Sequence, residues 1–282
     1  GSQSTPSQAH PNRAGDAWVM VRRLRTGLLC LMLLTLVGCA QQGVRNQAPA
    51  GEPTGQLGSP LVSRSPADIY IELSAAYLQE GNLNESFKNA KKAVLVDPNS
   101  SNAFYMQALV YQRLGENENA DASFQRAIKI DPRNPDALNA YGSFLCEQQR
   151  FEDADDYYRR ALSNPLYATP WLALYNAGRC LEQAGDETAA ERDYRAALRE
   201  NPGFAPSLLG MARISYEQTN YMSARAYLQR YAEVASHTPE SLWLGVRTEN
   251  QLGDKDQMAS YGLKLRARFP DSEQAMYLKA IE

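Results

Sequence analysis

The chain has 282 residues, 44% hydrophobic and 22% charged, so it can bury a substantial core in one or two domains and is neither disordered nor collagen-like. Its 29 basic and 32 acidic residues give a net charge of -3, which offers no basic field for nucleic-acid phosphates. The two histidines, His10 and His237, leave little material for histidine-based metal sites or catalysis, so the composition disfavours an enzyme.

The first 38 residues predict a leader followed by a secretion signal. Residues 1–19 show no periodicity, and we expect them to be a non-native leader outside the fold. Arg22, Arg23 and Arg25 then precede an apolar run over residues 27–37. This run is about half the ~20 residues that a membrane-spanning helix needs. Residues 20–38 are therefore predicted to be a signal peptide, and a buried core helix is the less favoured alternative.

The apolar run ends in Leu36-Val37-Gly38-Cys39, which resembles the bacterial lipobox. The resemblance implies that Cys39 is lipidated on sulfur and becomes the mature N-terminus. Several acyl chains together anchor a protein stably without spanning the membrane. Ala40 follows the cysteine where inner-membrane lipoproteins tend to carry Asp. The resemblance therefore implies an outer-membrane lipoprotein whose body lies in the periplasm.

Residues 39–66 are predicted to be the lipidated cysteine and a flexible tether. They are rich in Gln, Gly, Pro, Ser and Asn and poor in large apolar groups, so they cannot repay the entropy of ordering. A flexible chain of this length reaches about 25 to 30 Å, which is enough to clear lipid head groups.

From residue 67 the sequence repeats itself at intervals of 34 residues, with one interval of 36. A column of mostly small residues marks this register: Ser86, Ala120, Ala154, Ala190, Ala224 and Met258. Glycines recur where two paired helices would turn, at Gly81, Gly115, Gly185 and Gly253. Prolines close the units, at Pro98, Pro132, Pro202 and Pro270.

This pattern resembles the tetratricopeptide repeat. The unit 101–134 shows it most fully, with Phe104, Ala108, Tyr111, Gly115, Ala120, Phe124, Ala127 and Pro132. The repeats are expected at 67–100, 101–134, 135–168, 171–204, 205–238 and 239–272, with a capping helix at 273–282. One helical pair cannot bury its apolar face alone, so the pairs must stack. The resemblance implies an all-α, right-handed superhelix of six helix-turn-helix repeats.

No pattern in the chain predicts catalysis. There is no Walker loop, HExxH, G-x-S-x-G or Cys-x-x-Cys motif. Asp153, Asp155 and Asp156 are close enough to suggest a metal site, but a solvated helix face is the favoured reading. His237 is expected to be exposed in a loop. We therefore expect no enzyme, cofactor, metal or small-molecule substrate.

A stack of such repeats forms a groove from the first helix of each pair, suited to an extended or helical segment of a partner. In repeats one and two this groove carries apolar groups at Ile71, Ala75, Leu78, Tyr105 and Leu109. Exposed apolar area favours a partner's apolar helix face or strand, so these are the predicted partner-binding residues. The alternative is that they pack under the tether or under one another.

A second part of the groove is charged. Arg179, Arg213 and Arg247 recur at 34-residue steps, beside Tyr175 and Trp243. Guanidinium groups bind carboxylates well, so these five residues are predicted to form a secondary groove for a partner's carboxylates. The alternative, which we favour slightly, is that the arginines pair with Glu182, Glu217 or Glu249.

Beyond the signal and the lipidated residue, Cys146 and Cys180 remain. A pair of cysteines can bridge in an oxidising periplasm. Both fall within predicted helices, where small buried thiols are common. We therefore expect two free thiols, with a disulfide as the alternative.

The lipobox, the polar tether and six repeats together resemble the PilF/PilW family of type IV pilus lipoproteins, called pilotins. The resemblance implies that the protein binds secretin subunits and promotes their outer-membrane localisation and their assembly into multimers. It implies no enzymatic step, and the net charge of -3 separately disfavours a nucleic-acid partner. The alternative function is a periplasmic scaffold that organises peptidoglycan-modifying enzymes through the same groove.

Overall fold

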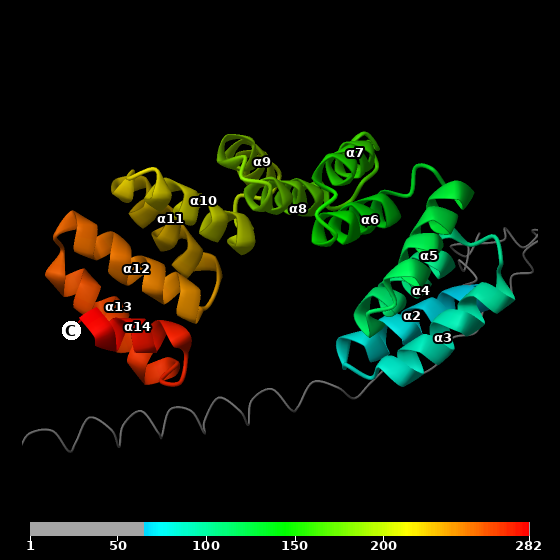
Figure 1. The fold of residues 1–282 in the computed structure, drawn as a ribbon, viewed down its shortest axis with the longest axis horizontal. Coiled ribbons are helices and arrows are strands. Elements are labelled where there is room, and N and C mark those ends of the chain that lie inside the picture. The colour runs from blue at the N-terminus through cyan, green and yellow to red at the C-terminus, as the bar shows by residue number, and fades with distance from the viewer. Residues whose placement is uncertain (1–64, 282) are drawn as a thin grey trace, which may run out of the picture. The chain divides into compact units, whose positions relative to one another are not determined.

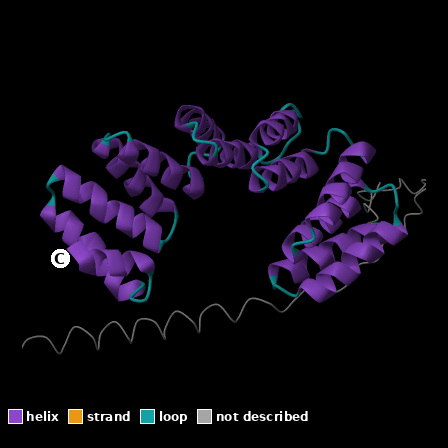
Figure 2. Ribbon diagram, viewed as in Figure 1, coloured by secondary structure: helices purple, strands orange, loops and turns teal. Residues whose placement is uncertain are grey.

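The computed structural model describes residues 65–281, and this part of the chain contains thirteen helices and no strand (Figures 1 and 2). The helices are α2 (Pro66–Gln79), α3 (Leu83–Val96), α4 (Ser101–Leu114), α5 (Asn117–Ile130), α6 (Pro135–Glu147), α7 (Phe151–Leu162), α8 (Pro170–Gln183), α9 (Glu187–Glu200), α10 (Ala205–Glu217), α11 (Tyr221–Val234), α12 (Pro239–Leu252), α13 (Lys255–Arg268) and α14 (Glu273–Ile281). The prediction of an all-α fold is confirmed.

Several predictions fall on residues outside this range. The leader at 1–19, the signal peptide at 20–38, the lipidation of Cys39 and nearly all of the tether at 39–66 lie outside the described residues. The described residues 65–281 belong to one compact unit. Within residues 65–281, no helix combines the length and the apolar character that crossing a bilayer requires.

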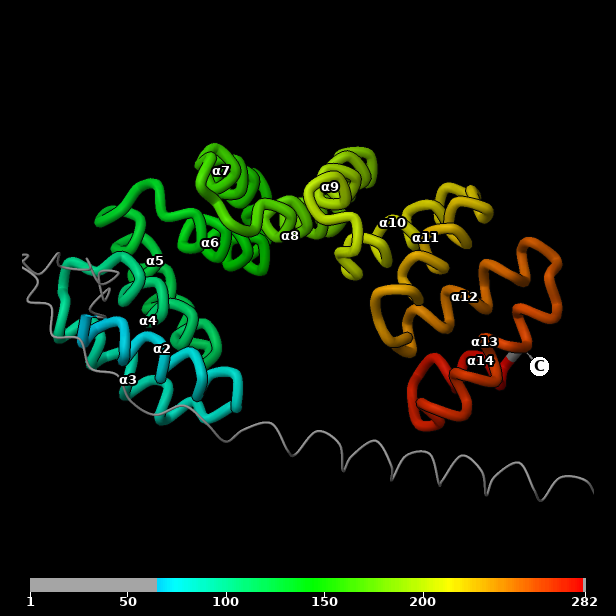
Figure 3. The backbone as a smooth tube through the Cα atoms, turned by 180° about the vertical axis from the view of Figure 1, so that it is seen from behind, coloured from blue at the N-terminus to red at the C-terminus, as the bar shows by residue number. Residues whose placement is uncertain are grey.

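The helices are arranged as six consecutive pairs followed by α14. The two helices of each pair contact each other, from α2 with α3 to α12 with α13. The first helix of each pair also contacts the first helix of the next, from α2 with α4 to α10 with α12. α14 lies against α12 and α13, as the view from behind shows (Figure 3). This is the tetratricopeptide superhelix that the sequence predicts.

Local sequence sets where the helices begin and turn. Side chains of Asn82, Asp186, Asn220 and Asp254 accept hydrogen bonds from the first turns of α3, α9, α11 and α13. The turn within four of the pairs uses a glycine in the left-handed region, such as Gly115 at φ 76°. Gln149 (φ 59°) and Thr219 (φ 61°) take the same conformation in the two turns that lack a glycine.

Tyrosines packed on glycines join the helices at their closest approaches. The buried ring of Tyr194 on α9 lies between Gly178 of α8 and Gly210 of α10. A Cβ atom added to either glycine would come within 2.8 Å of that ring. Tyr158 on Gly142 and Tyr261 on Gly245 each pack on a single glycine, within their own helix pair. Tyr194 therefore ties one repeat to the next, because opposite sides of its ring contact glycines of two different repeats.

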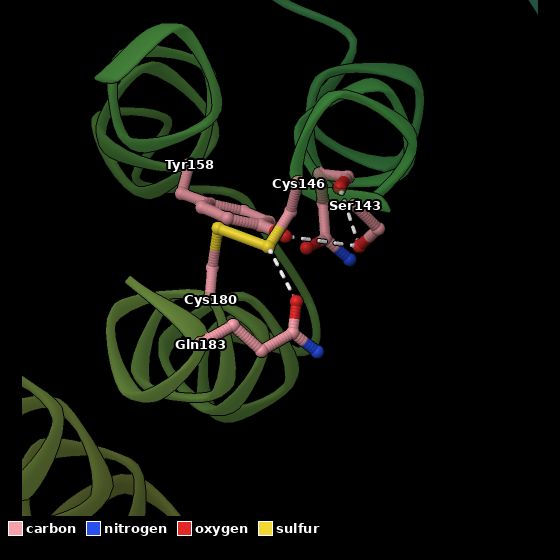
Figure 4. Close-up of a disulfide and its surroundings, with 6 residues drawn as sticks. Ser143, Cys146, Tyr158, Cys180 and Gln183 are labelled. Carbon is pink, nitrogen blue, oxygen red and sulfur yellow. Dashed lines mark hydrogen bonds between the residues drawn. A yellow bond between two sulfur atoms is a disulfide. The ribbon is translucent and has the colours of Figure 1, made fainter. Parts of the chain in front are cut away.

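The prediction of two free thiols is wrong, because Cys146 and Cys180 form a disulfide (Figure 4). Cys146 lies near the end of α6 and Cys180 on α8, and their Cα atoms are 5.7 Å apart, within the usual range for a disulfide. Both side chains are buried beside Tyr158 (Figure 4). The cysteines occupy different columns of the repeat, so the repeat register alone does not bring them together. The contact of α6 with α8 brings the two cysteines together.

Removing the disulfide by the double substitution Cys146→Ser/Cys180→Ser is expected to lower the free energy of unfolding. The bridge closes a loop of 34 residues, which restricts the unfolded chain and corresponds to roughly 2–4 kcal/mol. The measurement is urea unfolding followed by circular dichroism, with the reduced wild-type protein as a second comparison. Equal stability of the oxidised, reduced and Ser/Ser proteins would contradict the structure.

Gly210→Ala is expected to lower the free energy of unfolding by about 1–2 kcal/mol. Its methyl group would overlap a buried ring that Gly178 holds on the other face, and this overpacking outweighs the better helix propensity of Ala. Gly203→Ala is the matched control, because a Cβ there meets its nearest neighbouring atom at an ordinary 3.6 Å. The control should stay within about 0.5 kcal/mol of the wild type in the same urea titration.

Candidate protein-binding surfaces

The first candidate surface lies on α2 and α4 and is apolar. Ile71, Ala75 and Leu78 of α2 and Leu109 of α4 are half-buried, and they pack in one cluster with buried side chains of α3 and α4. The buried members of this cluster are Ala90, Met106 and Val110. The spacing of the three α2 residues along the helix places them on one side, toward α4. We call these four residues with Tyr105 the N-terminal surface.

Tyr105 extends this surface toward the next repeat. It packs against the neighbouring core cluster, to which Leu109 also contributes. Burial, with Asp136 and Tyr167 nearby, raises the pKa of Tyr105 to about 12, so its phenol stays protonated. The five predicted partner-binding residues therefore form a continuous strip in which each side chain is partly covered by its neighbours. Partner binding by this strip stays a prediction.

Several exposed apolar side chains of the first repeat are ones the sequence reasoning missed. Ile69 and Leu73 on α2 are 49% and 41% exposed, and Leu95 at the end of α3 is 80% exposed. The sequence held a signal for Ile69 and Leu73, because the α2 segment is apolar on nearly every face of the helix. In the structure, no described helix precedes α2 and covers its outer face.

The second candidate surface is a cleft of about 590 Å³ in repeats four to six. Its walls come mainly from α8 and α10, with Tyr231 and Glu240 at its edges. It contains Tyr175, Arg179 and Arg213 of the predicted secondary groove. Trp243 and Arg247 do not line it, so the structure brings together three of the five predicted residues.

Arg213 is held by two carboxylates. Its Nε and Nη2 donate to Glu182 at 3.0 and 2.8 Å, and its Nη1 donates to Glu240 at 2.8 Å. The hydroxyl of Tyr194 donates to the same Glu182 at 2.5 Å. Burial alone would lower the pKa of Arg213, but the two carboxylates outweigh it and raise that pKa. The guanidinium is therefore a link between α8, α10 and α12.

Arg179 is the exposed cation of the cleft. Its guanidinium carbon lies 5.9 Å from the centre of the Tyr175 ring. Among residues 65–281 it forms no ion pair with a carboxylate. Burial raises the pKa of Tyr175, so the ring beside Arg179 is uncharged. Of the three arginines in the predicted ladder, Arg179 is the one available to a carboxylate of a partner.

Arg247 and Trp243 are engaged elsewhere. Arg247 lies 3.5 Å from Glu217 and 4.1 Å from the centre of the Tyr216 ring. Trp243 packs against Tyr277 of the capping helix α14, with ring centres 5.9 Å apart. The alternative of internal pairing thus holds for Arg213 with Glu182 and for Arg247 with Glu217.

Glu249 does not pair with the arginine ladder. It is 2% exposed and binds Arg225 of the neighbouring helix α11, whose Nε donates to it at 3.0 Å. That hydrogen bond raises the pKa of Arg225. The repeat register could not reveal this pairing, because it depends on how α11 packs against α12.

The predicted acidic cluster is a salt-bridged helix face. Asp153, Asp155 and Asp156 pair with Arg150, Arg159 and Arg160 at 2.7, 2.8 and 3.6 Å respectively. Within residues 65–281, no group of His, Cys, Asp and Glu is arranged to hold a metal ion.

The prediction that His237 is exposed is wrong. Its ring is half-buried between Tyr231 and Tyr261, with ring centres at 6.1 and 5.7 Å. Burial, with Lys264 and Arg268 nearby, lowers the pKa of His237.

Comparison with known families identifies the repeats independently. Tetratricopeptide repeat models match residues 67–100, 105–170 and 167–204. The chain is 31% identical over 249 residues to the type IV pilus assembly protein PilF of Pseudomonas aeruginosa, covering 88% of this chain and 95% of that one. It is 33% identical over 112 residues to an uncharacterised protein of Haemophilus influenzae, covering 40% of this chain and 63% of that one.

Solved structures give the same picture. The structure of Pseudomonas aeruginosa PilF superposes with a TM-score of 0.70 at 33% identity, covering 77% of this chain and 97% of that one. The structure of PilW, described as a widely conserved type IV pilus biogenesis factor, superposes with a TM-score of 0.69 at 28% identity, covering 78% and 99%. The Cut9–Hcn1 structure shares the fold, with a TM-score of 0.63 at 15% identity, covering 75% and 42%.

Arg213→Ala is expected to lower the free energy of unfolding by about 1–3 kcal/mol, because it leaves Glu182 partly buried without its cation. Arg179→Ala is the matched control on the same surface, since it removes an exposed guanidinium that has no carboxylate partner among the described residues. Urea unfolding should separate the two variants. Equal losses from both would mean that Arg213 does not hold the repeats together.

Proposed function

Since this chain belongs to the PilF/PilW family of tetratricopeptide-repeat proteins, we propose that it is a pilotin of type IV pilus biogenesis. In this role it binds secretin subunits, brings them to the outer membrane and promotes their assembly into multimers. The observation that carries the proposal is the match to PilF along nearly the whole of both chains, repeats included. Binding another polypeptide is the whole activity, and no catalytic step is required.

The N-terminal surface is the proposed secretin site. Its side chains from α2 and α4 are half-buried, so a partner segment laid across them would complete their burial. Each Å² of apolar area removed from water contributes about 25 cal/mol, so a few such side chains suffice for a specific contact. An apolar helix face or strand of the secretin fits this chemistry better than a charged segment does.

The lipid anchor at Cys39 is the second part of the proposal. Acyl chains on Cys39 would hold the protein at the outer membrane, and residues 40–65 would let the repeats reach a secretin subunit near that surface. Tethering raises the effective concentration of a bound segment at the membrane, and a raised concentration favours assembly of a multimer.

A second candidate function is a periplasmic scaffold for peptidoglycan-modifying enzymes. The observation that favours it is the cleft of repeats four to six, where Arg179 is available to a partner's carboxylate beside Tyr175. A deletion strain separates the two functions, because loss of secretin multimers with normal cell-wall composition supports the pilotin and the reverse supports the scaffold.

Replacing Ile71, Leu78 and Leu109 by Asp is expected to abolish secretin multimers, because the charges remove the apolar contact on the N-terminal surface. The measurement is the amount of heat-resistant secretin multimer in outer membranes. Far-UV circular dichroism of the purified variant should show unchanged helicity. Because these side chains are half-buried, the milder single substitution Ile71→Ser is tested alongside it and should reduce multimers without affecting stability.

Two comparisons sharpen this test. Met222→Asp and Leu263→Asp introduce the same charge at apolar residues that are 62% and 63% exposed in other repeats, and they should leave multimers unchanged. Cys39→Ala should move the protein out of the outer-membrane fraction with its N-terminal surface intact. Normal multimer levels in a folded Ile71/Leu78/Leu109 variant would reject the proposed site.

A further inference from the structure

One end of the first repeat combines exposed apolar side chains with lysines. α2 begins there and α3 ends there, because the two helices of the pair run antiparallel. The ammonium of Lys92, near the end of α3, lies 5.5 Å from the ring of Tyr70, near the start of α2. Ser65, where the described chain starts, caps α2 at this same end. The segment that leads back to Cys39 therefore joins the repeats here.

The apolar part of this end is unusually exposed. Leu95 is 80% exposed and Val96 47%, both in the last turn of α3, while Ile69 in the first turn of α2 is 49% exposed. A mainly apolar hollow of about 730 Å³ has Phe87, Val94, Leu95 and Pro98 in its lining. Exposed apolar side chains of this kind can be buried at the boundary between lipid headgroups and acyl chains, and this burial needs no complementary protein surface.

The lysines lie on the same side of α3. Lys88, Lys91, Lys92 and Leu95 follow the i, i+3, i+4, i+7 spacing of one helix face, and the three lysines also border the hollow. Lys88 pairs with Glu85 at 2.7 Å. Lys91 and Lys92 contact only the aromatic rings of Phe87 and Tyr70 among the interactions found in residues 65–281.

Two carboxylates at this end, Asp68 and Asp97, accept hydrogen bonds from the backbone. Asp68 accepts a hydrogen bond from the N–H of Ser65 at 3.0 Å, and Asp97 accepts one from the N–H of Asn99 at 2.9 Å. Neither carboxylate forms an ion pair with Lys91 or Lys92, and both lysines are exposed, so among residues 65–281 their ammonium groups have no carboxylate partner.

We propose that this end of the first repeat, formed by Ile69, Leu95, Val96, Lys91 and Lys92, docks on an anionic lipid surface. The inference rests on the proposed lipid anchor, which would hold this end within about 25 to 30 Å of the bilayer through residues 40–65. Ammonium groups match lipid phosphates, and the protruding apolar side chains suit the boundary between headgroups and acyl chains. Docking orients the repeat stack on the membrane and adds a second contact to the acyl chains.

The test uses the repeat body, residues 62–282, whose described part belongs to one compact unit and which carries no acyl chain. It should sediment with phosphatidylcholine vesicles that contain phosphatidylglycerol, more weakly with pure phosphatidylcholine, and less as salt is raised. Lys91→Glu/Lys92→Glu should weaken binding at least about 25-fold, since each lysine at an anionic surface contributes about fivefold. Leu95→Ser should weaken it about tenfold.

The matched control is Lys264→Glu/Arg268→Glu on α13. These cations are exposed, lie over aromatic rings as Lys91 and Lys92 do, and occupy the sixth repeat. The control makes the same change in net charge and should alter binding less than twofold. Absence of wild-type binding, or equal weakening by the two double variants, would overturn the proposal. The vesicle assay contains no secretin. A negative result in it would therefore not contradict the proposed secretin assembly, and a negative result in the secretin test would not contradict lipid docking.

Discussion

The stacking of helix pairs is the constraint on which the rest of this structure depends. A single pair leaves one apolar face uncovered, so each pair must pack on the next. The buried Tyr194 shows how tightly this is done, since its ring fills the space between glycines of two successive repeats. Each inner pair packs on a pair at either side, whereas the first and the last pair have a neighbouring pair on one side only. α14 covers the C-terminal end, whereas α2 keeps Ile69 and Leu73 exposed.

The two halves of the stack are held by different interactions. In repeats three to six, a disulfide and partly buried ion pairs cross from one repeat to the next, among them Arg159 with Asp193 at 2.5 Å and Arg213 with Glu182. Most arginines of the predicted groove therefore already pair with carboxylates of the same chain. In repeats one and two the groove is apolar and half-buried, so its side chains still gain by contact with a partner.

The features that the two proposals use lie close together in the sequence. The apolar groove and the lysine-bearing end both belong to the first repeats, which follow the proposed anchor at Cys39. The cross-linked repeats lie farther from that anchor in the sequence. A partner held in the N-terminal groove would therefore stay close to the bilayer, while the C-terminal half provides a stable body and the cleft around Arg179.

The sequence by itself determined the fold and its register. Small residues, turn glycines and prolines recur at 34-residue intervals because each repeat needs them for its own helix crossing, turn and end. Only the tertiary structure decided which side chains meet between repeats. The Cys146–Cys180 bridge, the pairing of Glu249 with Arg225 and the half-burial of His237 all depend on how one helix rotates and shifts against another. Those contacts join residues in different columns of the repeat, so a pattern read along the chain carries no record of them.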